Sequence, residues 1–432
     1  MSLKFLIFNI LTLALTSSQL IQVNLDRELL KAWKGSDINS YLMELTDLNI
    51  VSIDPNTFTG LTNMEQLELE DNYIATLSPV TFRGLINMKI LHLYFNRLSA
   101  IDPTLFNGLT NLRTLSLQYN QISSLNPNTF NDLANLEYLT LNFNKLSSID
   151  ASTFSKLVNL KNLDLNTNSL TSLAPNTFSA LVNLKELYLN NNKLSSIPAG
   201  TFNGLSSLDR LFLNNNEFLS IDSGMFAQIS SLRFLSLANN KISTIEASSF
   251  NNLSKLQVLL FTNNSISALD ANVFKNLVSL EQLYLAQNKI VSMNPALFNG
   301  LTNLDQLDLN ENRISTVSPG TFNGLTSLKS LNLEYNSIRS IDVNLFKDLS
   351  SLEMLYLGTN DLSTLNPATF SLLYSLKALD LSTNLIISID RNILIGLVNL
   401  ERVIFSNNPI TGLQASYVLT LCQTNPKCIV II

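Results

Sequence analysis

The chain has 432 residues, of which 46% are hydrophobic, 14% are charged and 57 are Asn. The chain has one His, His92, and two Cys, which are too few for a clustered zinc site or a disulfide-dense fold. A single His also leaves almost no basis for His-dependent catalysis. The net charge of -6 argues against a nucleic-acid partner held through its phosphates.

The N-terminus has the features of a secretory signal peptide. Lys4 precedes an apolar stretch over residues 5–15, and Ser18 is a small residue that fits a cleavage site. An uncleaved membrane anchor is the alternative, but this stretch is too short to cross about 30 Å of hydrocarbon. We therefore predict a signal peptide over 1–18, a secreted, extracellular protein and no transmembrane helix.

A short amphipathic helix is predicted next. Apolar residues recur at helical spacing, and Gly35 is typical of a helix end. We expect an N-terminal helical cap over 19–39 that covers the first strand of the array. The apolar face of this helix comprises Leu25, Leu29, Leu30 and Trp33.

An apolar pattern then repeats every 24 residues, without insertion or deletion, from residue 64 to residue 399. With Met64 as position 1, Leu stands at positions 4 and 6, Asn at position 9 and Phe at position 19. A degenerate unit precedes the array and a partial one follows it, so the repeats fill residues 40–415 and leave no room for a second domain.

The physics of one unit predicts its structure. Residues 66–70 alternate polar and apolar, as in a half-buried strand, and one unit cannot bury its Leu face alone, whereas stacked units can. The Phe at position 19 is expected in the core. The Asn at position 9 both donates and accepts hydrogen bonds, so a column of Asn can satisfy backbone groups where the chain leaves the strand.

The unit L-x-x-L-x-L-x-x-N-x-L-x-x-L-x-x-x-x-F-x-x-L-x-x resembles the typical 24-residue leucine-rich repeat of extracellular proteins, as in Slit, Toll-like receptor ectodomains and variable lymphocyte receptors. This resemblance implies an α/β solenoid, a leucine-rich repeat horseshoe with about 16 parallel strands on the concave face. The Cys-rich N-terminal cap of such relatives is missing here. A short C-terminal cap over 416–432 holds Cys422 and Cys428, which either remain free thiols or, as we predict, form a disulfide.

Position 8 carries aromatic residues in three successive units, with further rings beside them. Rigid aromatic side chains on an exposed sheet resemble binding hot spots, although neighbouring rings can also shield one another without a ligand. We predict that a partner binds there. The residues are Tyr94, Phe95, Tyr119, Tyr138 and Phe143.

Carboxylates crowd the first full unit at Glu65, Glu68, Glu70 and Asp71. They form a solvated acidic face, or they hold Ca²⁺ or a basic partner. Because no calcium-loop spacing appears, we predict no metal site and no cofactor. Glu68, Glu70 and Asp71 are expected to form a charged rim beside the rings.

A looser aromatic and apolar cluster forms a secondary candidate patch. Position 8 holds an unbroken run of Asn from Asn191 to Asn263, which duplication of repeats would explain. Two glycosylation sequons begin at Asn252 and Asn263. The secondary patch comprises Tyr188, Phe212, Phe234, Leu260 and Tyr284.

Three functional classes follow. The first is a secreted binding protein, monomer or homodimer, that recognises a protein or glycan on its concave face. The second is an extracellular matrix spacer that self-associates. The third is an enzyme, which the sequence disfavours because it has no Gly-rich phosphate loop, no G-x-S-x-G and no sign of a closed cleft.

Overall fold

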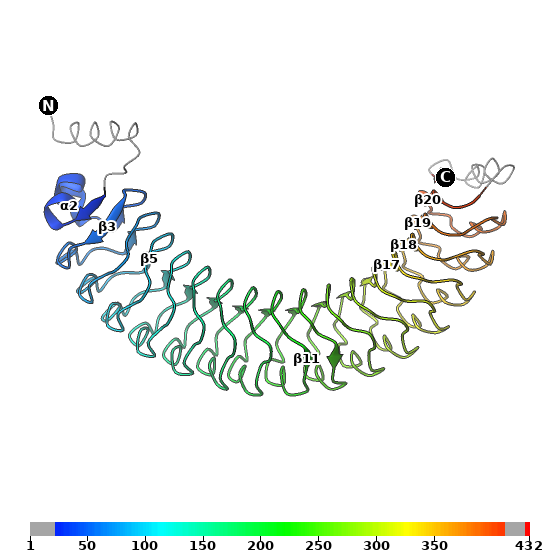
Figure 1. The fold of residues 1–432 in the computed structure, drawn as a ribbon, viewed down its shortest axis with the longest axis horizontal. Coiled ribbons are helices and arrows are strands. Elements are labelled where there is room, and N and C mark those ends of the chain that lie inside the picture. Colours follow the sequence, from blue (N-terminus) through cyan, green and yellow to red (C-terminus); the bar gives the residue numbers. More distant parts are fainter. Residues whose placement is uncertain (1–21, 411–427) are drawn as a thin grey trace, which may run out of the picture. The chain divides into compact units, whose positions relative to one another are not determined.

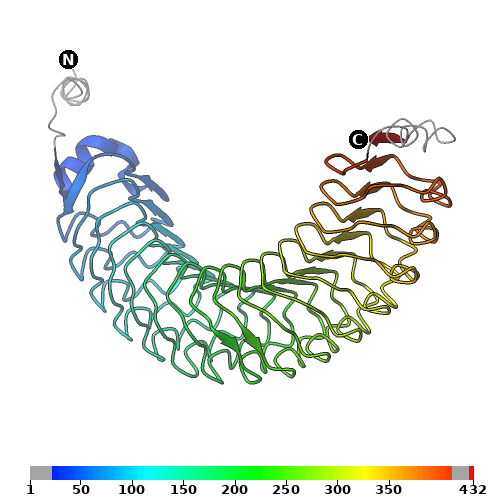
Figure 2. The same ribbon diagram turned by 45° about the vertical axis from the view of Figure 1, so that its right-hand side comes forward.

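The structure is a computed structural model that describes residues 22–410 and 428–432, so the predicted signal peptide lies outside the described residues. The chain forms two compact units, Met1–Leu211 and Phe212–Ile432. Within each unit, successive repeats stack into a parallel-strand solenoid, with the strand ladder on the inner side of that unit's curve (Figures 1 and 2). No helix in the described part of the chain is long and apolar enough to cross a bilayer.

In the first unit, each short ladder strand pairs in parallel with the strand of the next repeat, and equivalent repeat positions face each other, as Leu67 faces Leu91. The elements are β1 (Val23–Leu25), α2 (Arg27–Lys34), η2 (Gly35–Asn39), β2 (Leu42–Glu44), β3 (Ile50–Ile53), β4 (Gln66–Glu68), β5 (Ile90–His92), β6 (Thr114–Ser116), β7 (Tyr138–Thr140), β8 (Asn162–Asp164) and β9 (Glu186–Tyr188). Strand β10 (Arg210–Phe212) spans the boundary between the units.

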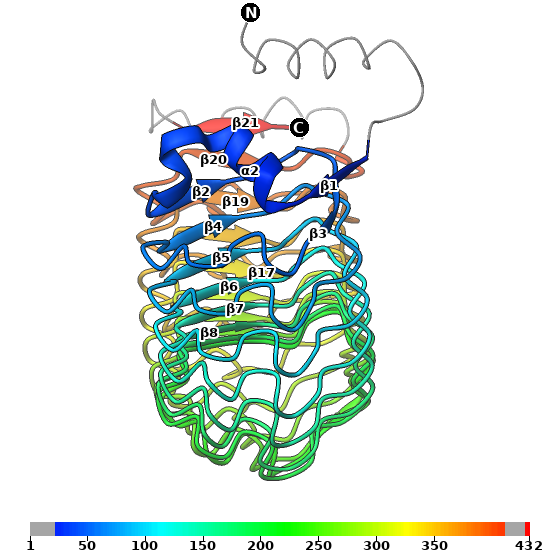
Figure 3. The ribbon, with the colours of Figure 1, turned by 90° about the vertical axis from the view of Figure 1, so that its left-hand side faces the viewer.

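The N-terminal helix forms where the apolar pattern predicts it. Asp26 caps α2 by accepting a hydrogen bond from the Leu29 amide at 2.8 Å, and the chain leaves the helix at Gly35 with a φ of 56°. Leu25 was wrongly placed on this helix, because it is the buried end of β1, which pairs in parallel with β3. Figure 3 shows this pair beside the main ladder of the first unit.

The second unit repeats the same ladder. From β12 through β20, its strands also pair in parallel with equivalent repeat positions face to face, as Leu307 faces Leu331. The elements are β11 (Ser220–Ile221), β12 (Phe234–Ser236), β13 (Thr244–Ile245), β14 (Val258–Leu260), β15 (Gln282–Tyr284), β16 (Gln306–Asp308), β17 (Ser330–Asn332), β18 (Met354–Tyr356), β19 (Ala378–Asp380), β20 (Arg402–Ile404) and β21 (Ile429–Ile431).

Strand β21 is an addition that the repeat count misses. It pairs in parallel with β20, and Val430 lies opposite Val403 although the two are further apart in sequence than one repeat. The C-terminal Ile-rich segment therefore adds a strand to the array. Cys428 directly precedes β21 and carries no free thiol, but Cys422 lies outside the described residues, so the pairing of the two stays a prediction.

The predicted core is confirmed in both units. Ladder leucines are buried, and the Phe column stacks rung upon rung; the ring centroids of Phe130 and Phe154, for example, are 6.3 Å apart. Each fully buried aromatic side chain contributes about 3 kcal/mol or more to stability. The buried column is Phe58, Phe82, Phe106, Phe130, Phe154, Phe178 and Phe202 in the first unit and Phe226, Phe250, Phe274, Phe298, Phe322, Phe346 and Phe370 in the second.

The Asn column at position 9 joins neighbouring turns, as predicted. Asn120 is typical: its Nδ2 donates to the carbonyls of Leu93 and Leu117 at 2.9 and 3.2 Å, and its Oδ1 accepts from the Leu98 amide at 2.9 Å. Three buried backbone groups are thus satisfied by one side chain, which makes these residues structural.

Candidate functional site

Three aromatic rings form a continuous stack on the first unit. Phe95, Tyr119 and Phe143 follow the C-terminal ends of β5, β6 and β7, and we call them the aromatic strip. Ring centroids lie 4.1 Å apart between Phe95 and Tyr119 and 4.2 Å between Tyr119 and Phe143, with interplanar angles of 13° and 11°. The rings remain 45%, 37% and 39% exposed, so stacking does not bury them.

The backbone under the strip is left-handed. Phe95, Tyr119 and Phe143 have φ of 49°, 54° and 52°. Such a conformation costs a bulky side chain about 1 kcal/mol or more, whereas Asn tolerates it. Position 8 is left-handed throughout the array, which gives the Asn run from Asn191 to Asn263 a conformational reason beyond repeat duplication.

The other predicted rings divide into two groups. Tyr94 touches the strip, since its ring centroid lies 5.9 Å from that of Phe95 in an edge contact, and His92 lies 5.6 Å behind Tyr94. Tyr138 is exposed on β7 but makes no ring contact among the described residues, so it stands apart from the strip.

The three carboxylates predicted to form a charged rim differ in exposure, and their role as a rim stays a prediction. Asp71 is exposed and Glu68 half-buried, where it accepts a hydrogen bond from Gln66 Nε2 at 2.7 Å. Glu70 is only 7% exposed, whereas the residue at position 7 is half-buried in most other turns. Burial raises the pKa of Tyr94, together with the negative charges of Glu70, Asp71 and Glu68 and a side-chain hydrogen bond to Glu70.

The secondary patch is half-buried in every member. Tyr188 lies in the first unit, donates to Glu186 Oε2 at 2.8 Å, and has a pKa raised to about 12 by burial and by that carboxylate. In the second unit, the ring centroids of Phe212 and Phe234 lie 4.9 Å apart, and Tyr284 donates to Gln306 Oε1 at 2.5 Å. These side chains, together with Leu260, are largely engaged within the fold.

A polar groove of about 500 Å³ runs along the opposite ends of the strands in the first unit. Glu137 joins two turns at its centre, with Arg113 Nη1 at 3.3 Å and Lys161 Nζ at 2.6 Å. The hydrogen bond from Lys161 lowers the pKa of Glu137. The groove is lined by Asn111, Arg113, Asn135, Glu137, Asn159, Lys161, Asn183 and Lys185.

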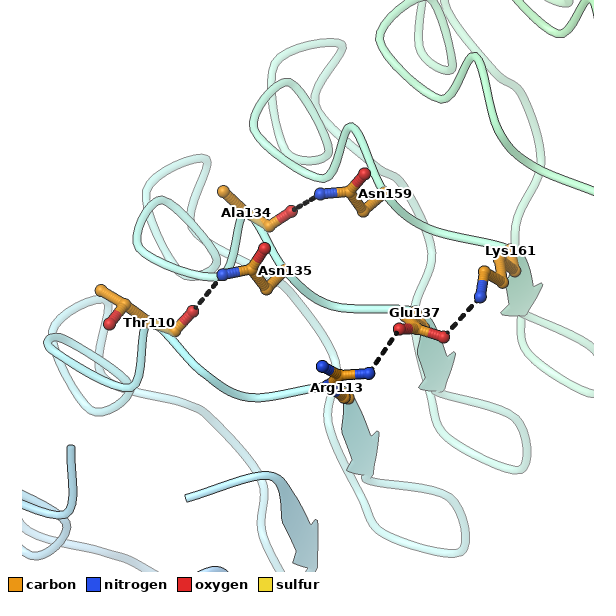
Figure 4. Close-up of polar contacts among 7 residues, drawn as sticks. All are labelled: Thr110, Arg113, Ala134, Asn135, Glu137, Asn159 and Lys161. Carbon is orange, nitrogen blue, oxygen red and sulfur yellow. Dashed lines mark hydrogen bonds and ion pairs between the residues drawn. The ribbon is translucent and has the colours of Figure 1, made fainter. Parts of the chain in front are cut away.

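The groove suits a hydroxyl-rich or acidic ligand. Asn135 and Asn159 donate to the carbonyls of Thr110 and Ala134 at 2.9 and 3.0 Å, so their own oxygens are left as acceptors (Figure 4). Sequence reasoning missed this surface. The sequence does contain a pattern that indicates it, because four successive repeats carry Asn at position 24 and a charged residue at position 2 of the next unit.

The remaining predicted sites are separate from these surfaces. Asn252 and Asn263 are both exposed, and their amides donate to Ala227 O and Asn239 Oδ1 at 2.8 Å each. Glycosylation at either stays a prediction. Within residues 22–410 and 428–432, no group of three or more His, Cys, Asp or Glu side chains is arranged to hold a metal ion.

Solved structures share this architecture. The TLR13–ssRNA13 complex matches with a TM-score of 0.80 and 24% identity over 95% of this chain and 61% of that chain. An LRR protein from Leptospira interrogans, LIC12759, matches with a TM-score of 0.74 and 25% identity over 95% of this chain and 100% of that one. The plant peptide hormone receptor RGFR1 in complex with RGF2 matches with a TM-score of 0.64 and 27% identity over 86% of this chain and 60% of that one.

The chain thus spans less than two thirds of the TLR13 and RGFR1 chains. No curated protein sequence matches it. The family model described as Leucine rich repeat matches residues 41–93, 86–146, 134–194, 182–242, 235–290, 283–338 and 326–386. These segments cover most of the chain and coincide with the stacked turns of both units, so the protein belongs to the leucine-rich repeat family.

Proposed function

We propose that this protein is a secreted, extracellular binding protein that holds a protein partner at the aromatic strip of its first unit. The observation that carries the proposal is the combination of stacking, exposure and backbone conformation at Phe95, Tyr119 and Phe143. Three adjacent rungs place exposed rings on a backbone that favours Asn. A conformational cost repeated at neighbouring positions is typical of functional surfaces.

The energetics also favour binding there. An exposed apolar strip gives a soluble protein no gain in solubility, and contiguous apolar surface often marks an interaction site. Stacking has already fixed the rings, so a partner that covers them loses little side-chain entropy on binding. Truncating a central hot-spot ring typically costs about 2 kcal/mol or more of binding free energy.

Relatives give a context for this proposal. RGFR1 is seen in complex with RGF2 and TLR13 with ssRNA13, so proteins of this fold hold ligands of different chemistry. For this chain, the net charge of -6 favours a protein over a nucleic acid, and we assign no catalytic role.

A glycan partner is the second candidate, and the groove favours it. Amide oxygens on successive turns, flanked by Arg113 and Lys161, suit hydroxyl donors and an acidic group. The matrix-spacer alternative predicts instead that the chain self-associates without any partner.

The test is capture of extracellular proteins by the purified secreted chain, compared with two double variants. Tyr119→Ala with Phe143→Ala should abolish capture of the partner, whereas Phe234→Ala with Leu260→Ala in the secondary patch should leave it unchanged. Analytical ultracentrifugation of the same proteins measures self-association.

The outcomes separate the candidates. Loss of capture only in the secondary-patch variant means that the wrong surface was chosen. Capture that survives both double variants but fails in Arg113→Ala with Lys161→Ala points to the groove and a glycan. Concentration-dependent self-assembly with no captured partner supports the matrix spacer.

A further inference from the structure

Glu70 is a buried carboxylate with an unused oxygen. Its side chain is only 7% exposed, yet its Oε2 accepts no hydrogen bond among the described residues. An unsatisfied buried polar atom is costly, and more so when it belongs to a charged group. Buried carboxylates normally have a paired cation or several donors, so this oxygen requires an explanation.

Among the described residues, no Lys or Arg forms an ion pair with the carboxylates around Glu70. Glu68 and Asp71 flank Glu70 on the same turn, and none of the three forms an ion pair there. The preceding turn adds Glu44 and Asp47, whose carboxylates form no salt bridge, although Lys34 Nζ donates to the Glu44 backbone carbonyl at 2.7 Å. The nearby Lys89 pairs with Glu65 at 2.8 Å instead. The carboxylates of the two turns outnumber Lys34 and Lys89, so a positive group supplied from outside would meet a net negative field.

Two aromatic residues lie on the next turn, whose backbone pairs with this one: the Asp71 amide donates to the Tyr94 carbonyl and the Asn72 amide to the Phe95 carbonyl, at 3.2 Å each. Burial raises the pKa of Tyr94, and so do the charges of Glu70, Asp71 and Glu68 and a side-chain hydrogen bond to Glu70. The neighbouring Phe95 ring is exposed and forms the first member of the aromatic strip. We call Glu68, Glu70, Asp71, Tyr94 and Phe95 the acidic corner.

We propose that the acidic corner binds the guanidinium group of an arginine side chain on the protein partner. Carboxylates accept its planar, paired N–H groups, and the face of an aromatic ring attracts its charge. The protein uses the same contact internally, since the Arg97 guanidinium lies 4.3 Å from the centroid of the Tyr73 ring. Arginine fits better than lysine because only its flat group both stacks and forms paired hydrogen bonds.

This inference rests on the proposed function, because it names the chemistry that the partner presents beside the strip. It also gives Glu70 a role that requires its burial. A carboxylate already removed from water loses less solvation when the guanidinium arrives, and its charge-assisted hydrogen bond is stronger there than at an exposed rim.

The test needs no partner. N-acetyl-arginine amide is titrated into the secreted chain by calorimetry or NMR, and the citrulline analogue, which has the same shape without the charge, serves as the ligand control. The arginine probe should bind and the citrulline probe should not. Glu70→Gln should weaken arginine binding by about tenfold or more, as expected for loss of one charge-assisted hydrogen bond.

Two variants separate recognition from folding and general charge. Glu401→Gln removes one negative charge from an exposed position in the second unit and should leave binding unchanged. Phe95→Leu keeps the carboxylates but removes the ring, so it should weaken arginine binding by several-fold. Thermal melting should show Glu70→Gln to be folded and no less stable than the wild type, because the unsatisfied charge is gone.

Other results overturn the inference. Equal binding of the two probes, unchanged arginine binding in Glu70→Gln, or Ca²⁺ binding at Glu70 with no arginine binding would each exclude a guanidinium site. If the probe fails but the strip variants still lose their partner, the proposed function stands without this inference. If the probe binds while strip variants retain the partner, the acidic corner stands and the strip is wrong.

Discussion

The same backbone position is used in two ways along the chain. At position 8 of the first unit, Phe95, Tyr119 and Phe143 stack on left-handed backbone. At position 8 of the second unit, Asn239 and Asn263 have φ of 53° and 56°, and the amide of Asn263 donates to Asn239 Oδ1 at 2.8 Å. The scaffold fixes the conformation in both places and leaves the side chain free to vary.

The difference separates what the repeat requires from what it tolerates. Asn matches left-handed backbone, so its ladder in the second unit needs no functional explanation. Aromatic side chains oppose the same backbone, yet they occupy three consecutive turns. This contrast depends on three conditions: the solenoids of the two units are equivalent, the aromatic strip binds a partner, and the left-handed backbone under the aromatic residues is strained.

The largest expected effect tests the equivalence of the scaffolds. Phe130 stacks between two rings at 6.3 Å in the first unit, and Phe250 lies 5.9 and 6.5 Å from its column neighbours in the second. Phe130→Ala and Phe250→Ala should each cost about 3–5 kcal/mol of unfolding free energy by urea denaturation, because both leave a cavity in a close-packed column. A clearly smaller loss at either site would mean that the units differ in packing.

Periodicity explains why the fold was predictable. The regular spacing of Leu, Asn and Phe specifies the strand, the ladder and the core, and the structure has all three. Departures occur where one local pairing replaces the repeat. Leu25 has helical spacing to Leu29 but pairs as a strand, and Ile429–Ile431 joins the ladder out of phase with the repeat, which periodicity does not encode.

The candidate site was less predictable because side-chain environment depends on neighbouring turns. Sequence columns place Phe95, Tyr119 and Phe143 together, and the rings do stack. The repeat positions alone do not show that Glu70 is buried while Asp71 beside it is exposed. Nor do they show that Tyr138 lies outside the aromatic strip. Left-handed backbone at position 8 was signalled only indirectly, by its surplus of Asn.

The next effect concerns binding at the strip. Tyr119→Ala should lower the affinity for the captured partner by about 2 kcal/mol or more, because it removes the central ring of a preorganised stack. Asn239→Ala, at the same position in the second unit, should leave affinity unchanged. Surface plasmon resonance with both variants measures the contrast, and equal losses would show that position 8 contributes to binding without regard to residue type.

A smaller effect measures the backbone strain itself. Tyr335 also occupies position 8, with a φ of 52°, but it makes no ring contact among the described residues. Tyr335→Asn should therefore raise the unfolding free energy by about 1 kcal/mol, since it relieves the left-handed strain and breaks no stack.

Tyr119→Asn is the matched variant within the strip. It relieves the same strain but loses two ring contacts, each worth about 0.5–1.5 kcal/mol, so it should not stabilise the protein. Urea denaturation of both variants gives the stacking free energy as their difference. Equal stabilisation by both substitutions would mean that the stack contributes nothing to the free energy of folding and that the rings contribute only to binding of a partner.

The smallest effect depends on pH and compares position 5 in the two units. Burial raises the pKa of Asp164 in the first unit and of Asp308 in the second, although hydrogen bonds from Asn166 and Asn310 oppose the shift. A carboxyl whose folded pKa lies above its ordinary value of 3.8 favours folding only when it is protonated, and that contribution is lost as pH rises through the folded pKa. At pH 7 each aspartate is therefore a buried charge that slightly destabilises its unit.

Replacing this aspartate by asparagine isolates the charge. Asp164→Asn keeps the acceptor for the Asn166 amide, now 2.9 Å away, and removes the charge, so it should raise the unfolding free energy at pH 7 by less than about 1 kcal/mol. The gain should shrink as pH falls and disappear once the wild-type carboxyl is protonated in both the folded and the unfolded chain. Asp308→Asn should behave in the same way if the two units hold position 5 alike. Urea denaturation at neutral and acidic pH measures this pH dependence. If the gain in unfolding free energy persists at acidic pH, the asparagine stabilises the protein through a new contact and not through removal of the buried charge.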